Sequence, residues 1–422
     1  GTIKLDGNYP TGTDNVALGD TALDSVEAGG VGNVAIGSKA GTAITTGDNN
    51  VAIGTCSLLV NTTGYDNVGI GRRALDANIS GLANVGIGSS ALTANTTANS
   101  NVAVGTCAMF VNTTGTCNTA IGTVALAANT TASFNTAVGM RAMLNTTTGN
   151  KNVAVGTSAM QCNTTGSANT AVGGMDANAF PTMFANTTGS SNTAIGNSAL
   201  ICNTTASNNT AVGKNALAVN TTGATNTAVG QNSLNSNTTA ADNTAVGAGS
   251  LYANTEGTGN TAVGRQALVA NTTANSNTAV GASALYSNTT GANNVAVGRT
   301  ALENSTTATA NTAIGFGSLR ANTDGHSNTG AGQCALNGNT TGDHNTAVGF
   351  NALDSNTTAN NNTAVGSNAL CLNIEGHCNT AVGFNALLKN TTQRNTAVGA
   401  YAALCNTTGQ QNVAVGYYTL DA

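Results

Sequence analysis

One pentapeptide returns through nearly the whole chain at an almost constant spacing. The motif, Asn-[Thr/Val]-[Ala/Gly]-[Val/Ile/Leu/Ala]-Gly, begins at Asn15 and occurs 24 times, the last copy starting at Asn412. Of the 23 intervals, 20 are 17 residues long, and those after Asn15, Asn169 and Asn379 are 18, 23 and 16 residues long. A fixed short period of this kind predicts stacked structural repeats, each of which contacts only its neighbours.

The composition agrees with a thin stack of coils. The 422 residues include 53 Gly and no Trp, and only 7% are charged, against roughly 25% in an ordinary soluble protein. Small aliphatic residues are too frequent for a disordered chain. The net charge of −5 provides no basic surface, and no stretch approaches the roughly 20 apolar residues of a membrane span. We therefore expect neither a nucleic-acid partner nor membrane insertion.

Numbered from the Asn, the repeat has the consensus N-[TV]-A-[VI]-G-x-x-A-L-x-x-N-T-T-G-x-x. Side chains alternate along a strand, so positions 2 and 4 share one face. Because these positions are Thr, Val, Ile or Leu in nearly all copies, we expect them to point into the coil beside the Leu at position 9. The Gly at position 5 and the N-T-T-G segment predict two corners. The sequence thus predicts an all-β fold, a parallel β-solenoid (β-roll) of about 24 coils with two short strands each.

The other face of the predicted strand is restricted to small residues. Position 3 is Ala in 21 copies and Gly in the remaining three, Gly69, Gly86 and Gly330. A solvated face would vary among polar residues, so we interpret this restriction as close contact with a neighbouring chain, most simply in a parallel homotrimer. An alternative stays open, in which the Ala packs inside a narrow coil.

The repeat resembles two groups of fibrous proteins. The N-[TV]-A-[VI]-G strand followed by a Gly corner is similar to the S-V-A-I-G repeat of trimeric autotransporter adhesin heads, which are left-handed parallel β-rolls. The longer consensus resembles the N-T-A-x-G-x-x-A-L-x-x-N-T-T-G arrays of phage tail fibres, and the likeness covers residues 15–422. It implies a trimeric fibre without assigning a functional residue.

Departures from the repeat divide the chain. Residues 1–14 are expected to form an N-terminal cap or junction, residues 15–168 and 192–422 regular solenoid repeats, and residues 169–191 an irregular repeat with a six-residue excess. Extra residues in a repeat become loops on one face, often the binding face. This repeat therefore predicts an apolar contact loop, although it also fits a plug in a trimer groove or a duplication seam. Its candidate residues are Met175, Phe180, Pro181, Met183 and Phe184.

Most copies carry an Asn-x-Ser/Thr sequon at the second corner. In a secretory host these Asn residues are candidate glycosylation sites. The competing interpretation is that Asn-Thr-Thr-Gly is a favourable turn whose Asn side chains stack from coil to coil. Representative sites are Asn61, Asn95, Asn163, Asn220 and Asn356.

No constellation in the sequence predicts catalysis. The nine Cys and three His residues lack the spacing of a disulfide framework or a metal site. Only the same-coil pairs Cys107/Cys117 and Cys371/Cys378 are near enough to be considered as disulfides. Nucleophile elbows, phosphate loops and paired acidic residues in register are missing from the sequence. We expect no metal, no cofactor and no enzymatic activity.

The predicted function is that of a structural and adhesive fibre shaft outside the cell. We expect a phage or virus tail fibre that acts as a spacer and contacts a host receptor or glycan; the alternative is a bacterial cell-surface trimeric adhesin. An ice-binding solenoid is the remote alternative, because such a protein needs outward-facing ranks of Thr and position 2 is expected to face inward.

Overall fold

The computed structural model describes residues 12–174 and 180–420 and consists of two units, residues 1–214 and 215–422. Each unit holds twelve parallel strands of three residues, one for each copy of the repeat, and the described residues contain no helix. The prediction of an all-β parallel solenoid with a 17-residue repeat is confirmed.

The first unit contains β1 (Val16–Leu18), β2 (Val34–Ile36), β3 (Val51–Ile53), β4 (Val68–Ile70), β5 (Val85–Ile87), β6 (Val102–Val104), β7 (Thr119–Ile121), β8 (Thr136–Val138), β9 (Val153–Val155), β10 (Thr170–Val172), β11 (Thr193–Ile195) and β12 (Thr210–Val212). The second contains β13 (Thr227–Val229), β14 (Thr244–Val246), β15 (Thr261–Val263), β16 (Thr278–Val280), β17 (Val295–Val297), β18 (Thr312–Ile314), β19 (Thr329–Ala331), β20 (Thr346–Val348), β21 (Thr363–Val365), β22 (Thr380–Val382), β23 (Thr396–Val398) and β24 (Val413–Val415).

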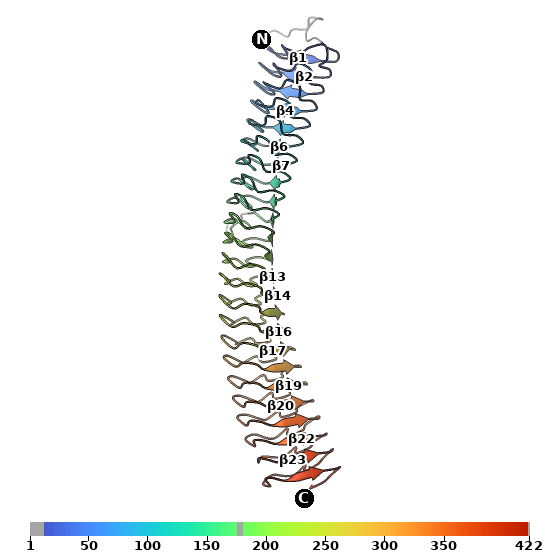
Figure 1. Ribbon diagram of the computed structural model, residues 1–422, viewed down its shortest axis with the longest axis vertical. Helices are drawn as coiled ribbons and strands as arrows, with labels where there is room; N and C mark the ends of the chain where they lie inside the picture. Colours follow the sequence, from blue (N-terminus) through green and yellow to red (C-terminus); the bar gives the residue numbers. More distant parts are fainter. Residues whose placement is uncertain (1–11, 175–179, 421–422) are drawn as a thin grey trace. The chain divides into compact units, whose positions relative to one another are not determined.

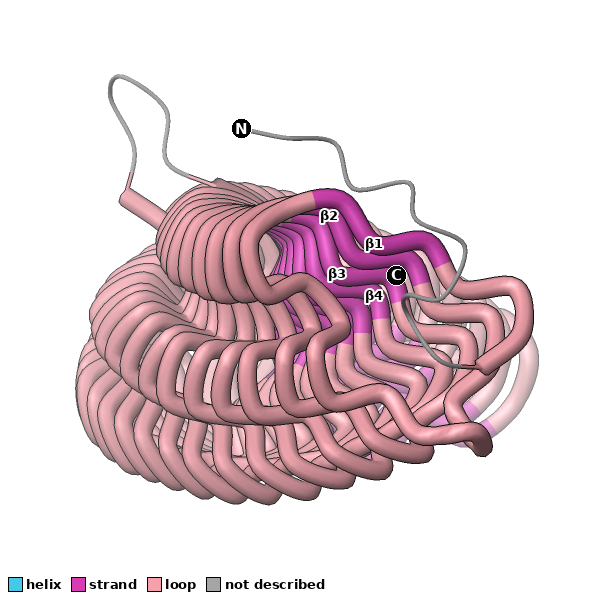
Figure 2. Tube along the Cα trace, turned by 90° about the horizontal axis from the view of Figure 1, so that it is seen from above, coloured by secondary structure: helices cyan, strands magenta, loops and turns pink. Residues whose placement is uncertain are grey.

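Within each unit, strands from successive coils stack in strict register. In the pair β14–β15, for example, Thr244 pairs with Thr261, and Val246 with Val263. The Thr244 N–H donates to the Asn260 carbonyl at 2.8 Å, so the ladder also holds the residue before each strand. The strands therefore form a parallel sheet along one side of the coils (Figure 1), and turns make up the rest of each coil (Figure 2).

Each coil has one short strand where the sequence predicted two. Positions 7, 9 and 17 have left-handed backbone conformations, as in Gln266 (φ 58°), Leu268 (φ 51°) and Ser276 (φ 59°). Such a conformation costs an L-residue roughly 1–2 kcal/mol, and it keeps the segment after the Gly corner from forming a second strand. The turns still stack, because the Leu268 N–H donates to the Ala284 carbonyl of the next coil at 3.0 Å.

The prediction that positions 2 and 4 point into the coil is wrong. Ala262, at position 3, is fully buried, whereas Val263, at position 4, is 36% exposed, and this pattern recurs along both units. The cause is the narrow interior. A Cβ placed on Gly86, another position 3, would lie 3.2 Å from Leu75 Cγ and 3.3 Å from the Ala91 carbonyl oxygen. The interior therefore accepts at most a methyl group there, and the β-branched side chains lie outside. The alternative of Ala packing inside a narrow coil is the one the structure adopts.

The Gly at position 5 forms the corner that ends each strand, as expected. Gly247 has φ of 132°, and a Cβ added to it would lie 2.6 Å from the carbonyl carbon of Gly264 in the next coil. Both the backbone conformation and the close approach of the next coil exclude a side chain.

The 16-residue coil absorbs its deletion without disturbing the stack. The carbonyl of Thr392 takes the place of the position 15 carbonyl and accepts hydrogen bonds from Asn379 Nδ2 and Asn390 Nδ2, both at 2.7 Å.

Of the predicted N-terminal cap, residues 1–11 lie outside the described residues.

Candidate interaction surfaces

The side chains of positions 2 and 4 form the outward face of the sheet, which we call the strand face. Nearly all of them are the β-branched residues Thr, Val and Ile, along both units. Position 2 is half-buried in most coils, and position 4 is half-buried or exposed. In β18, for example, Ile314 is 46% exposed. Exposed apolar side chains that recur from coil to coil make this face a candidate interaction surface. Its exposed apolar members at position 4 include Ile36, Ile121, Val155, Ile195, Val263, Val280, Ile314, Val348, Val365, Val382, Val398 and Val415.

Two ladders of buried Asn side chains lie inside the coils. At position 1, Asn67 Oδ1 accepts the Asn84 N–H of the next coil at 3.0 Å, and Asn84 Nδ2 donates to the Ala98 carbonyl of its own coil at 2.8 Å. At position 12, Asn95 Nδ2 donates to Asn78 Oδ1 at 2.9 Å and to the same Ala98 carbonyl at 3.1 Å. A coil with Asn at both positions is thus closed at position 15 by two amides, which also link it to its neighbours.

The candidate glycosylation sites belong to the position 12 ladder. Asn61, Asn95, Asn163, Asn220 and Asn356 are all fully buried. The Nδ2 atom that would carry a glycan instead donates to the position 15 carbonyl of the same coil, as Asn61 Nδ2 does to Gly64 at 2.9 Å. A glycan on this atom is incompatible with the folded coil, since it would remove the hydrogen bond and occupy the core. The side chains stack from coil to coil, as the competing interpretation of the sequons supposed.

The position 12 ladder has two internal breaks. Thr146 follows Asn129, and Ser305 follows Asn288, so neither supplies an amide donor to the preceding coil. As a result, Asn129 Oδ1 and Asn288 Oδ1 are buried without a hydrogen-bond partner. A buried polar atom without a partner costs about 1–3 kcal/mol, so these breaks are weak points in their coils.

The irregular repeat places its predicted contact residues in different environments. Met183 is fully buried with φ of 49° and fills the core position that Leu holds in most other coils. Pro181 is buried and Phe184 is half-buried, whereas Phe180 is 69% exposed. The Ser198 N–H donates to the Phe180 carbonyl at 3.1 Å, which puts Phe180 at position 6. Met175 lies outside the described residues, and of the four candidates that the structure describes only Phe180 is exposed.

Positions 6 and 7 form an exposed edge beside the strand face. From the coil of β18 to that of β24, four aromatic residues occupy position 6 of alternate coils, and we call them the aromatic row: Phe316, Phe350, Phe384 and Tyr417. Sequence reasoning missed this row, although reading position 6 down the aligned copies would have revealed it. The rings are 45–70% exposed.

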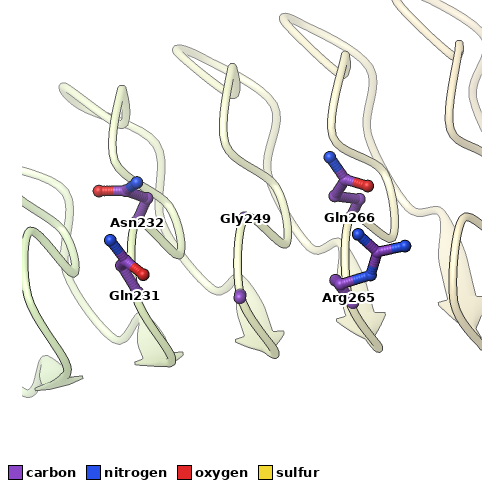
Figure 3. A pocket seen from close by; sticks show the side chains of 6 residues that line it. Gln231, Asn232, Gly249, Arg265 and Gln266 are labelled. Atoms are coloured by element: carbon purple, nitrogen blue, oxygen red, sulfur yellow. The ribbon is translucent and has the colours of Figure 1, made fainter.

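The same edge is hollowed where a coil has small residues at positions 6 and 7. Around Gly249, a shallow notch is lined on one side by Gln231 and Asn232 and on the other by Arg265 and Gln266 (Figure 3). The lining offers amide and guanidinium donors without a cluster of titratable groups.

The cysteines show no cross-link in the described part of the chain. All nine are free thiols, including the pairs Cys107/Cys117 and Cys371/Cys378. Burial raises the pKa of the Cys162, Cys202 and Cys371 thiols, which makes them less reactive as nucleophiles.

Residues 12–174 and 180–420 contain no group of three or more His, Cys, Asp or Glu side chains able to hold a metal ion. A helix long and apolar enough to cross a membrane is likewise missing from this described part. Comparison with known proteins found no matching family model and no matching curated protein.

Proposed function

We propose that this chain is the shaft of an extracellular fibre in which parallel copies, most simply three, associate through their strand faces. The leading assignment is a phage or virus tail fibre that holds a receptor-binding part at a set distance, and the alternative is a bacterial surface adhesin. The observation that carries the proposal is the strand face itself, a β-branched surface repeated in register through twelve coils in each unit.

Association through the strand face involves other residues than the position 3 residues that the sequence indicated. The small residues at position 3 are buried inside the coil, so they cannot contact a neighbouring chain. The strand face is instead rich in Thr, Val and Ile, which pack well against another pleated surface. Burying apolar area contributes roughly 25 cal/mol per Å², and a surface that recurs in every coil multiplies the gain along a parallel assembly.

The mass of the particle in solution tests this proposal. Light scattering after size exclusion should give a multiple of the 41.1 kDa chain mass, and three chains are expected. Placing Asp at Val246 and Val280, two coils apart on the strand face, should reduce the particle to a monomer while circular dichroism stays unchanged.

The matched control places Asp at Thr239 and Thr273, which have the same separation but are exposed at position 14. This variant should keep the wild-type mass. A monomeric wild-type chain, or equal masses for the two double variants, would refute association through the strand face.

Ice binding is a second candidate, because the structure reverses the premise that made it remote. Thr244, Thr261 and Thr278 stand in register on the outward face of β14, β15 and β16. These strands read Thr-Ala-Val, so Thr forms one outward rank while Val forms the other. A thermal-hysteresis assay on the wild type and on Thr261→Lys tests for ice binding. Hysteresis that is present in the wild type and lost in the variant would favour ice binding, and a wild type without hysteresis would exclude it.

A further inference from the structure

The aromatic row differs from an ordinary apolar patch in its spacing. Coils stack about 4.8 Å apart, so rings on alternate coils are separated by about 9.6 Å along the stack. The intervening coils carry Gln333, Ser367 and Ala400 at the same position. A surface that binds an apolar protein face would have apolar side chains at these intervening positions.

Planar amides flank the rings. Asn351, Asn368 and Asn385 occupy position 7 of successive coils and are half-buried, and Asn368 Nδ2 donates to Asn385 Oδ1 at 3.2 Å. An amide side chain offers two donors and an acceptor with two lone pairs, so this chain of amides has bonding capacity left for a ligand. The edge therefore combines stacking surfaces with hydrogen-bonding groups at a fixed offset.

The rings at the last coils support one another. The Tyr401 and Tyr418 rings are stacked at 4.5 Å between centroids, and Phe384 and Tyr417 lie against Tyr401 edge-on at 5.2 and 6.0 Å. Packing of this kind fixes the orientation of exposed rings before a ligand arrives.

We propose that the second unit binds an extended β-1,4-linked polysaccharide along the aromatic row. A pyranose ring has an apolar face of C–H groups, which stacks on an aromatic ring, and a rim of hydroxyls, which bonds to amides. In an extended β-1,4-linked chain every second sugar presents the same face, and the length of this disaccharide unit is close to the height of two coils. This inference rests on the proposed role of the chain as an exposed fibre, for which it names the recognised ligand.

Two other occupants fit the row less well. Single-stranded nucleic acid also stacks on spaced rings but needs a positively charged groove. Residues 215–422 contain five Lys and Arg against eight Asp and Glu. Arg299 lies 6.0 Å from the centroid of Phe316, the first ring of the row. An apolar face of a second copy of the chain would bury Gln333 and the flanking Asn amides without supplying hydrogen-bond partners.

Binding of short oligosaccharides to the full chain tests the proposal. Calorimetry is run with β-1,4-linked hexasaccharides of glucose and of N-acetylglucosamine, and with the α-1,4-linked glucose hexasaccharide as ligand control. At least one β-linked ligand should bind and the α-linked ligand should not, because its helical chain does not keep the two-coil spacing. The double variant Phe350→Ala/Phe384→Ala should weaken binding at least tenfold, since it removes the large apolar stacking faces of two rings.

The matched variant is Phe110→Ala/Phe134→Ala, which removes two exposed rings of the first unit from other repeat positions. Its affinity should equal that of the wild type. No binding of either β-linked ligand, equal binding of the α-linked ligand, or an unchanged affinity of Phe350→Ala/Phe384→Ala would overturn the proposal. A fall in particle mass in that variant would assign the row to contacts between copies instead. Because particle mass is measured separately, loss of the glycan site and failure of the fibre assembly remain distinguishable.

Discussion

Completing the broken Asn ladder at Ser305 should stabilise the coils around it. In the variant Ser305→Asn, the new Nδ2 can donate to Asn288 Oδ1 and to the Ala308 carbonyl, and the new Oδ1 can accept from Asn322 Nδ2. An unbroken coil shows that this geometry is attainable, because Asn288 Nδ2 donates to Asn271 Oδ1 and to the Gly291 carbonyl, each at 3.0 Å.

The magnitude follows from the bonds gained and the cost of ordering. Each hydrogen bond contributes about 0.5–1.5 kcal/mol net, and the buried Asn288 Oδ1, which now has no partner, regains about 1–3 kcal/mol. Ordering the longer side chain costs about 1–2 kcal/mol, and Ser305 Oγ gives up no bond, because it makes none. The expected gain is about 2 kcal/mol, which corresponds to roughly 30-fold slower local opening.

Hydrogen exchange read by mass spectrometry is the suitable assay, because a long repeat array opens locally and does not unfold as one unit. Peptides covering residues 288–322 should exchange about 30-fold more slowly in the variant, and peptides of the first unit should be unchanged.

The control reverses the change in an intact stretch of the same ladder. Asn271→Ser removes the donor to Asn254 Oδ1, which now accepts at 2.8 Å, and should accelerate exchange around residues 254–288 by a similar factor. If Ser305→Asn left exchange unchanged while Asn271→Ser accelerated it, the completed site would not hold an amide. If neither variant changed exchange, the ladder would not stabilise the coils at all.

Three further predictions concern other parts of the repeat. Gly247→Ala should destabilise its coil by at least about 3 kcal/mol, since it strains a φ of 132° and drives a methyl group into the next coil; local hydrogen exchange as slow as in the wild type would contradict this. Val124→Asn should stabilise by about 1 kcal/mol, because a β-branched residue is held at φ of 48° where Asn is tolerated; the measurement is local hydrogen exchange, and faster exchange would count against it. Burial raises the pKa of Asp354, so the stability linked to its protonation is present below its unfolded pKa and is lost as the pH rises through its folded pKa. Asp354→Asn should therefore slow local hydrogen exchange relative to the wild type at pH 7 and leave it unchanged at pH 3, and the opposite pH dependence would refute this assignment.

The sequence by itself determined the architecture. Twenty-four copies of one pentapeptide, 17 residues apart, leave little choice besides stacked coils, because each copy then pairs in register with the next. The Gly at position 5 is present in every copy, and this constancy located the corner. The Asn at position 12 was identified either as a glycan acceptor or as a stacking turn residue, but sequence alone left the choice open.

Only the tertiary structure decided which face of the strand lies inside. One face of the strand carries Ala and the other carries Thr, Val or Ile. Because neither face is charged or strongly polar, periodicity alone does not distinguish core from surface. The decision depends on the width of the coil, which is set by the left-handed residues at positions 7 and 9. They bring Leu75 of one coil so near Gly86 of the next that only a methyl group fits between them. The β-branched residues are thereby left outside, where they form the surface on which the proposed assembly depends.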